Sequence, residues 1–226
     1  MIHRDSLGIK QSYGAESRHD DAHVQWLTAG AGIQHEEMWD TDGNVWSDQE
    51  LYQIWLNLPS GYKMTKPKVE LLRRHFVKDE EEIPDRSTPI IDEDGTVTTV
   101  VCGEYGAISA SIDCPTNAAI LQVHFKKGAV WKHVMPKEHE TAILYIRKGS
   151  VKIGSEIVPV HHTAYLTRDG EELVIESEGE ADVLLLSGEP LREPSVIHIL
   201  QYILSHTQSS NKLNSSFAEL HLKGQW

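Results

Sequence analysis

The chain has 226 residues and a formal net charge of −13, from 34 acidic and 21 basic side chains. A surface of that sign repels phosphate, so direct binding of nucleic acid is not expected. No apolar run approaches the roughly 18 residues of a membrane-spanning helix, and the first residues lack the apolar segment of a secretory signal. Cys102 and Cys114 form neither a CxxC motif nor a disulfide framework, so we expect reduced thiols. Together, these features predict an intracellular protein without membrane contact.

The segment 24–39 carries the strongest local pattern. Residues 24–27 are typical of a short apolar strand, a Gly-Ala-Gly turn follows, and a second short strand contains His35 and Glu37. Because residues i and i+2 of a strand point to the same face, this imidazole and this carboxylate can converge on one point. Such a pair suits Fe, Mn, Ni or Zn, whereas a closed structural zinc site would require thiolates. We therefore predict that His35 and Glu37 are metal ligands, although two ligands do not hold a transition metal.

Further along, residues 52–58 place apolar side chains at every second position, which predicts a half-buried strand. Trp26 and Trp55 both lie in strand patterns and are expected to be core residues. The interval 78–95 combines an acidic run with two prolines and an Asp-Gly turn. We interpret it as an acidic linker between a first domain, 1–77, and a second domain, 96–194.

The second domain contains short apolar segments that recur with turn signals between them. This spacing is typical of a β-sandwich or barrel, so an all-β fold is expected. Residues 195–226 instead place apolar side chains at i, i+3 and i+4, which predicts a short helical tail. The predicted strands of the second domain are 97–101, 108–112, 118–125, 142–146, 151–153, 173–176 and 183–186.

Several longer motifs are spread over residues 3–194. They are His3-Arg4-Asp5-Ser6-Leu7-Gly8, Val24-Gln25-Trp26-Leu27-Thr28-Ala29-Gly30, Gly32-Ile33-x-His35-x-Glu37-Met38, Ile54-Trp55-Leu56-Asn57-Leu58-Pro59, Pro159-x-His161-His162-Thr163-Ala164 and Gly188-Glu189-Pro190-Leu191-Arg192-Glu193-Pro194. In these motifs the chain resembles the pirin family of the cupin superfamily. The resemblance implies a bicupin, in which two antiparallel β-sandwich or jelly-roll barrels follow one another. It also implies one Fe²⁺ site in the first barrel, held by three His and one Glu, and a metal-free second barrel.

By position in the resemblance, His35 and Glu37 match the last two of the four iron ligands. The other two would come from a His-Pro-His-Arg-Gly-Phe-Glu-like motif upstream of the segment at His3, and this sequence does not contain it. Either the sequence is a fragment or shortened product, or it is a family member with a broken metal site. We therefore expect an N-terminally truncated first barrel in which Fe²⁺ binds weakly or not at all. His3, His19 and His23 are candidate substitutes, although the surroundings of His19 are typical of a solvated turn.

The second domain can be tested for a cupin metal site on its own residues. The best match to the pattern is Gly128-x4-His133-Val134-Met135-x2-Glu138, with Gly149 ending the hairpin. Met135 stands where a second histidine is needed, and a thioether is a poor ligand for a ferrous centre that reacts with oxygen. The residues therefore favour a barrel that keeps the fold without the metal chemistry.

Two functions of different classes follow as hypotheses. The first, implied by the resemblance, is an iron-dependent dioxygenase that opens the ring of flavonols of the quercetin type, with Glu37 as both ligand and catalytic base. The second is a regulatory module that contacts a protein partner of the transcription-factor type, in the nucleus, the cytoplasm or both. An acidic surface is compatible with a basic partner. The missing histidines favour the regulatory module for this chain and the dioxygenase for a longer parent.

Overall fold

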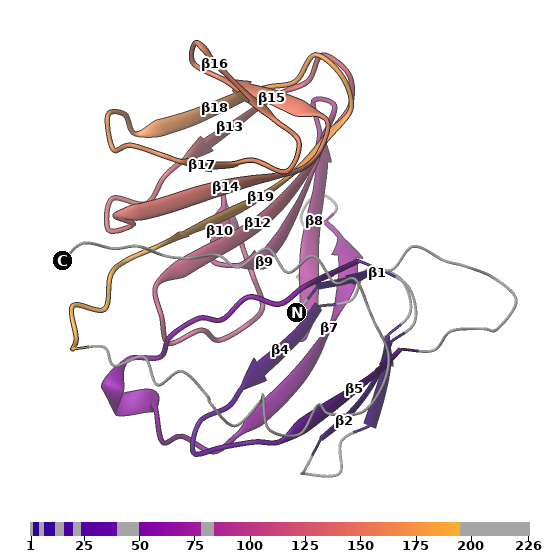
Figure 1. Cartoon of the computed structure of the whole chain (residues 1–226), viewed down its shortest axis with the longest axis vertical. Helices are drawn as coiled ribbons and strands as arrows, with labels where there is room; N and C mark the ends of the chain where they lie inside the picture. Colours follow the sequence, from indigo (N-terminus) through magenta and orange to yellow (C-terminus); the bar gives the residue numbers. More distant parts are fainter. Residues whose placement is uncertain are drawn as a thin grey trace, which may run out of the picture. The chain divides into compact units, whose positions relative to one another are not determined.

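The computed structural model describes residues 2–4, 7–11, 16–19, 24–39, 50–77 and 84–194 (Figure 1). Within these ranges the chain is almost entirely β-structure, with one short 3-10 turn, η1 (Ser60–Tyr62). The predicted all-β fold is confirmed. No helix in the described ranges has the length and apolar composition needed to cross a bilayer. The predicted helical tail, 195–226, and the acidic run at 79–82 lie outside the described residues.

The largest element is a ten-stranded sheet to which both predicted domains contribute. All neighbouring strands run antiparallel except β7 and β8, which pair in parallel with Arg73 opposite Ser87. In sheet order the strands are β17 (Thr163–Tyr165), β14 (Thr141–Lys148), β19 (Ala181–Gly188), β12 (Ala118–Phe125), β9 (Thr96–Cys102), β8 (Ser87–Glu93), β7 (Lys68–Phe76), β4 (Val24–Thr28), β1 (Ile2–Arg4) and β6 (Glu50–Tyr52).

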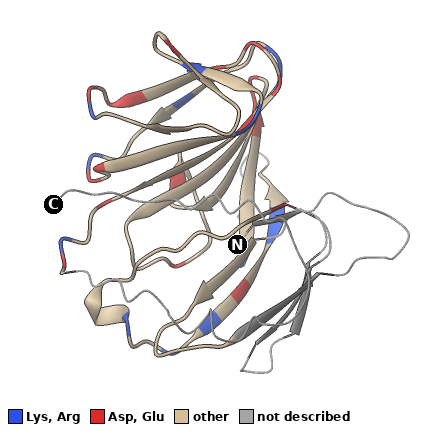
Figure 2. Ribbon diagram, viewed as in Figure 1, with Lys and Arg blue, Asp and Glu red and all other residues tan. Residues whose placement is uncertain are grey.

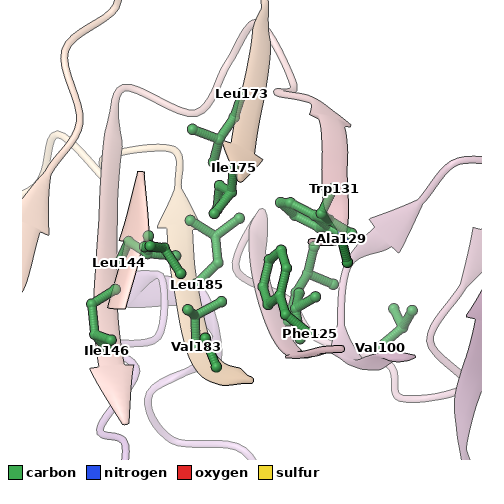
Figure 3. Packing of buried hydrophobic residues seen from close by; sticks show 14 residues of the cluster. Val100, Phe125, Ala129, Trp131, Leu144, Ile146, Leu173, Ile175, Val183 and Leu185 are labelled. Atoms are coloured by element: carbon green, nitrogen blue, oxygen red, sulfur yellow. The ribbon is translucent and has the colours of Figure 1, made fainter. Parts of the chain in front are cut away.

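A four-stranded sheet packs on the C-terminal strands of the large sheet and closes the main hydrophobic core. Its order is β13 (Val130–Val134), β18 (Glu172–Glu176), β15 (Ser150–Ile153) and β16 (Glu156–Pro159). Trp131 and Ile175 of this sheet meet Phe125, Leu144 and Leu185 of the large sheet (Figure 3). Two facing sheets with a dry interior form the sandwich that a cupin barrel requires.

The first half of strand β12, residues 118–121, is apolar at every position because both of its faces are covered there, whereas Gln122 and His124 in the second half are partly exposed. Leu121, Val123 and Phe125 face the main core, while Ile120 belongs to a second buried cluster. A strand buried on both sides loses the apolar-polar alternation of a half-exposed strand. The second cluster joins strands of the two predicted domains and consists of Val24, Leu72, Val101, Cys102, Ile112, Ile120 and Leu184.

Two small sheets complete the fold. A two-stranded sheet pairs β10 (Glu104–Tyr105) with β11 (Ile108–Ser109). A three-stranded sheet has the order β3 (Glu16–His19), β2 (Leu7–Gln11) and β5 (His35–Trp39). The predicted strand that contains both candidate ligands is β5, in which His35 pairs with Gln11 and Glu37 pairs with Ile9.

The interval 78–95, predicted to be an acidic linker, contains strand β8. Its first four residues, from Ser87 to Ile90, are buried, and β8 pairs with β7 on one side and with β9 on the other. The acids and the two prolines, of which Pro89 lies inside β8, are typical of a linker, but two isoleucines and two strand partners place this stretch in the sheet. The division into two domains at this point stays a prediction.

The predicted strand at 52–58 is shorter in the structure. Strand β6 ends at Tyr52, and residues 53–59 have no regular secondary structure although their burial still alternates. Trp55 is 81% exposed, so its assignment to the core was wrong, whereas Trp26 packs against the second buried cluster. The alternation therefore indicates which side chains face the interior of the protein. It does not show whether the backbone is hydrogen-bonded in a sheet.

Candidate functional site

The turn between β4 and β5 fixes the path of the chain into the predicted ligand segment. Gly30 has φ +50° and Gly32 has φ +126°, in the left-handed region that favours glycine. The backbone N–H of Ala31 donates to the Thr65 carbonyl oxygen at 2.9 Å, and a Cβ on Gly30 would lie 2.1 Å from that same oxygen. The close approach explains why this position carries glycine, and it anchors the turn to the segment that follows η1.

His35 and Glu37 occupy alternate positions of β5, as the sequence predicted. His3 lies on β1 in the ten-stranded sheet, opposite Leu51, and not in the sheet that contains β5. His19 pairs with Leu7, four residues along β2 from the partner of His35, which is about 13 Å at the rise of a strand. Neither of these two histidines is therefore a strand partner of His35, and His23 lies outside the described residues.

Within the described part of the chain, no group of three or more His, Cys, Asp or Glu side chains lies close enough to hold a metal ion. An imidazole and a carboxylate are suitable donors for Fe²⁺, but two donors leave most of its coordination positions to other groups. This result does not extend to the side chains of His35 and Glu37, which are not among the described ones. The assignment of His35 and Glu37 as ligands, and of Glu37 as a catalytic base, stays a prediction.

An apolar pocket of about 370 Å³ lies beside this turn. Ala29 and Ile33, on either side of the two glycines, form part of its wall, and Trp26 and Trp55 contribute aromatic surface. A mostly apolar pocket with few polar groups is the usual form of a small-molecule site. The remaining lining residues are Gln25, Leu27, Thr28, Gln53, Ile54, Leu56, Leu58, Val101, Pro115 and Ile120.

A second pocket, also of about 370 Å³, is lined by charged and apolar side chains, among them Asp182 of β19. Asp182 Oδ1 lies 2.7 Å from His124 Nδ1, and its Oδ2 accepts a hydrogen bond from Arg147 Nη2 at 2.7 Å. Arg147 also pairs with Glu50. Burial opposes the charge on Asp182, but the hydrogen bonds from Arg147 and His124 outweigh it and hold the pKa of Asp182 below its ordinary value.

The sequence alone does not reveal this charged network. His124 and Asp182 are directly opposite one another on β12 and β19, although 58 residues separate them in the chain. Neither residue belongs to a short motif, so only the pairing register reveals the contact. The network joins β12, β14 and β19 of the second domain to Glu50 of β6 in the first.

His133, from the incomplete metal pattern of the second domain, is a core residue. It is 5% exposed and stacks on Trp131 and Tyr105 with ring centroids 5.4 Å and 5.8 Å away. Burial, with a smaller contribution from His139, lowers the pKa of His133 to about 4. Met135 packs against the same core. His133 therefore stays neutral and packs as an aromatic ring, and the absence of a metal from this barrel stays a prediction.

The adjacent histidines of the second domain have separate partners. His161 Nδ1 lies 3.2 Å from the Tyr145 hydroxyl, whereas His162 Nδ1 donates to the Val160 carbonyl oxygen at 3.0 Å. The hydrogen bonds of the two rings thus do not converge on a common site; both residues lie in the turn between β16 and β17, where His161 has φ +62°.

His133 makes stability depend on pH. In the unfolded chain its pKa is near the ordinary 6.5, so between about pH 6.5 and pH 4 only the unfolded state takes up the proton. The free energy of unfolding should therefore fall as the pH is lowered through this range, by up to about 1.4 kcal/mol per pH unit. Urea unfolding at several pH values measures this slope. His133→Phe keeps an aromatic ring without a proton and should have a shallower slope, whereas equal slopes would contradict the assignment.

Two family models match the chain. The Pirin model covers residues 1–56, and the model of the Pirin C-terminal cupin domain covers residues 120–199. The chain belongs to the pirin family of cupin proteins. The two matches fall on either side of the β7–β8 junction. The second match lies on the C-terminal strands that build the sandwich.

Curated relatives and a solved structure agree with this membership. The chain is 32% identical over 201 residues to "Putative quercetin 2,3-dioxygenase PA2418" of Pseudomonas aeruginosa, covering 87% of this chain and 65% of that protein. It is 30% identical over 206 residues to human Pirin, covering 88% of this chain and 64% of human Pirin. The crystal structure of quercetin 2,3-dioxygenase from Acinetobacter baumannii matches 86% of this chain and 65% of that chain, with 28% identity and a TM-score of 0.68. The chain therefore spans less than two thirds of the length of these two curated relatives.

Proposed function

We propose that this pirin-family chain is a regulatory binding module that holds Fe²⁺ weakly. The metal part of the proposal concerns His35 and Glu37, which match two of the four iron ligands that the family resemblance implies. Two donors do not retain a labile ferrous ion against competition from water and buffer. The apolar pocket beside the turn at Gly30 supplies a binding site that does not depend on the metal.

The partner in this proposal is a protein with a basic surface. The chain has a formal net charge of −13. Along the ribbon, charged residues lie mostly at strand ends and in the connecting loops, and most strand residues are uncharged (Figure 2). Opposite charge on a partner accelerates association and helps to fix its orientation. A transcription factor-like protein in the nucleus or cytoplasm fits this description.

A second candidate function is flavonol ring opening of the quercetin 2,3-dioxygenase type. The relative from Pseudomonas aeruginosa, whose name suggests that activity, is 32% identical. The apolar pocket, lined by Trp26, Trp55 and several aliphatic side chains, suits a planar aromatic molecule. In this alternative Glu37 accepts the proton of a flavonol hydroxyl, and the chain requires two further ligands from a longer form of the protein.

Metal analysis of the purified chain tests the first proposal. After loading with Fe²⁺ under anaerobic conditions and dialysis, we expect well below one iron per chain, and His35→Ala should change this little. One tightly held iron per chain would overturn the proposal. In that event, Ala replacements of His3, His19 and His23, one at a time, would identify the additional ligand. If only one of these replacements removes the iron, the replaced histidine is the additional ligand.

A further inference from the structure

The second pocket has a floor of polar side chains from three adjacent strands, β9, β12 and β19 (Figure 1). On β12, Phe125 faces the main core, whereas Gln122 and His124 alternate with it and line the pocket. Thr99 of β9 is directly opposite Gln122, and Asp182 of β19 is directly opposite His124. The pocket therefore lies on the face of the large sheet that is turned away from the main core.

The two carboxylates of the second pocket, on Glu50 and Asp182, already have partners. Both pair with Arg147, and Asp182 also lies 2.7 Å from His124 Nδ1. The Asp182 side chain is only 13% exposed, so a cationic ligand that displaced Arg147 would leave a guanidinium without its partner in a partly buried place. These acids thus build the wall of the pocket and are not available to hold a cation.

Three other groups of the second pocket are available to a ligand. The Arg74 guanidinium of β7 lies over the Phe76 ring, 5.5 Å from its centroid, and has no carboxylate partner within the described ranges. The Thr99 hydroxyl and the Gln122 amide are partly buried, and neither side chain makes a hydrogen bond to the described part of the chain. Polar groups withdrawn from solvent are normally hydrogen-bonded, so these three donors suit a polar ligand.

We propose that the second pocket binds a small organic carboxylate, with Arg74 holding the carboxylate and with Thr99 and Gln122 binding polar atoms of its body. A guanidinium presents two parallel N–H donors that match the two oxygens of a carboxylate. The pocket volume of about 370 Å³ is within the range of small-molecule sites. Because the chain has a net charge of −13, it repels anions in general, and binding depends on this local cation.

This site stands apart from the proposed function. Of the residues that the structure describes, none lines both the apolar pocket and the second pocket, and the carboxylate site requires no metal. Arg74 belongs to the first predicted domain, whereas Thr99 and Gln122 belong to the second. A ligand that bridges them should therefore stabilise the folded chain as a whole, since it binds the folded state and not the unfolded one.

Calorimetric titration of the whole chain with acetate, succinate and citrate, three carboxylates of increasing size, tests the proposal. We expect saturable binding of at least one of them, one molecule per chain, with a rise in melting temperature. Succinamide, the uncharged analogue of succinate, should bind at least about tenfold more weakly than succinate, because it lacks the charge-assisted hydrogen bonds. Inorganic phosphate serves as the second control, and binding of phosphate as tight as that of every carboxylate would overturn the assignment to this class.

Substitutions on β7 locate the site. Arg74→Ala should weaken carboxylate binding by about tenfold or more, and Arg74→Lys, which keeps the charge without the paired donors, should have an intermediate affinity. Arg73→Ala is the matched control, because it removes the same charge at the next position of β7, from a residue that does not line the pocket. Its affinity should be unchanged, whereas equal losses in Arg73→Ala and Arg74→Ala would reduce the effect to general attraction by charge.

Two further variants separate the second pocket from the apolar one. Gln122→Glu places a negative charge on the floor in a side chain of the same size and should abolish binding, while Trp55→Ala in the apolar pocket should leave it unchanged. Melting of each variant without ligand verifies that it is folded. The proposal is wrong if none of the three carboxylates binds saturably up to about 10 mM, a weak affinity for a site of this kind. Normal binding by Gln122→Glu, or its loss in Trp55→Ala, would also contradict it.

Discussion

Replacing Trp131 with alanine should lower the free energy of unfolding by about 3–5 kcal/mol, the usual range for removal of a large buried aromatic side chain. Trp131 is 1% exposed, and its Nε1–H donates to Thr98 Oγ1 at 2.9 Å. Its ring stacks on Tyr105 with centroids 5.4 Å apart. The substitution leaves a cavity between the two sheets and a buried hydroxyl without its donor. Equilibrium unfolding in urea measures the loss.

Trp55→Ala is the matched control for this substitution. It removes the same side chain from a position that is 81% exposed, so the free energy of unfolding should change by no more than about 0.5 kcal/mol. Because Trp55 lines the apolar pocket, its loss should be visible in ligand binding instead. Equal destabilisation by the two variants would mean that the main core is not where the structure places it.

Glu37→Gln should reduce flavonol ring opening by about 10²-fold or more, the contribution typical of a general base. The assay uses a form of the protein that also carries the upstream His-Pro-His segment, because the second candidate function requires that segment. The substitution keeps the shape of the side chain but removes the negative charge that balances a bound cation and accepts a proton. Initial rates of flavonol consumption, normalised to the folded fraction, provide the measurement.

Two controls separate a role in chemistry from a general loss of charge or fold. Glu36→Gln removes the same charge at the next position of β5 and should leave the rate nearly unchanged. His133→Ala should affect stability, because His133 stacks in the main core, but should cost little activity per folded molecule. The opposite ranking, with His133 essential and Glu37 dispensable, would place the chemistry in the C-terminal barrel.

Much of the fold could be predicted from local sequence because short apolar segments between turns mark strands without further information. The pattern succeeded at 118–125, where β12 has the same bounds, and at the strand that contains His35 and Glu37. It did not succeed at β8, because the acids and prolines in and before this strand are typical of a linker. What keeps this stretch in the sheet is pairing with β7 and β9, and such pairing is not encoded in the stretch itself.

The candidate site could be predicted only as far as its local geometry. Alternation within a strand was enough to associate His35 with Glu37. The apolar pocket could not be predicted in this way, since its wall combines residues near Gln25 and Trp55 with Pro115 and Ile120. The contact between His124 and Asp182 likewise depends on the register of β12 and β19.

The parallel pairing of β7 with β8 makes the two predicted domains interdependent. If residues 84–194 were separated from the rest, β8 would become an open edge, and the Ile90 carbonyl oxygen would lose its bond from the Val77 N–H. Leu72 and Val24 would also leave the second buried cluster. Open strand edges beside uncovered apolar surface promote self-association. Each half thus covers a strand edge and apolar surface of the other, and neither half is independent of the other.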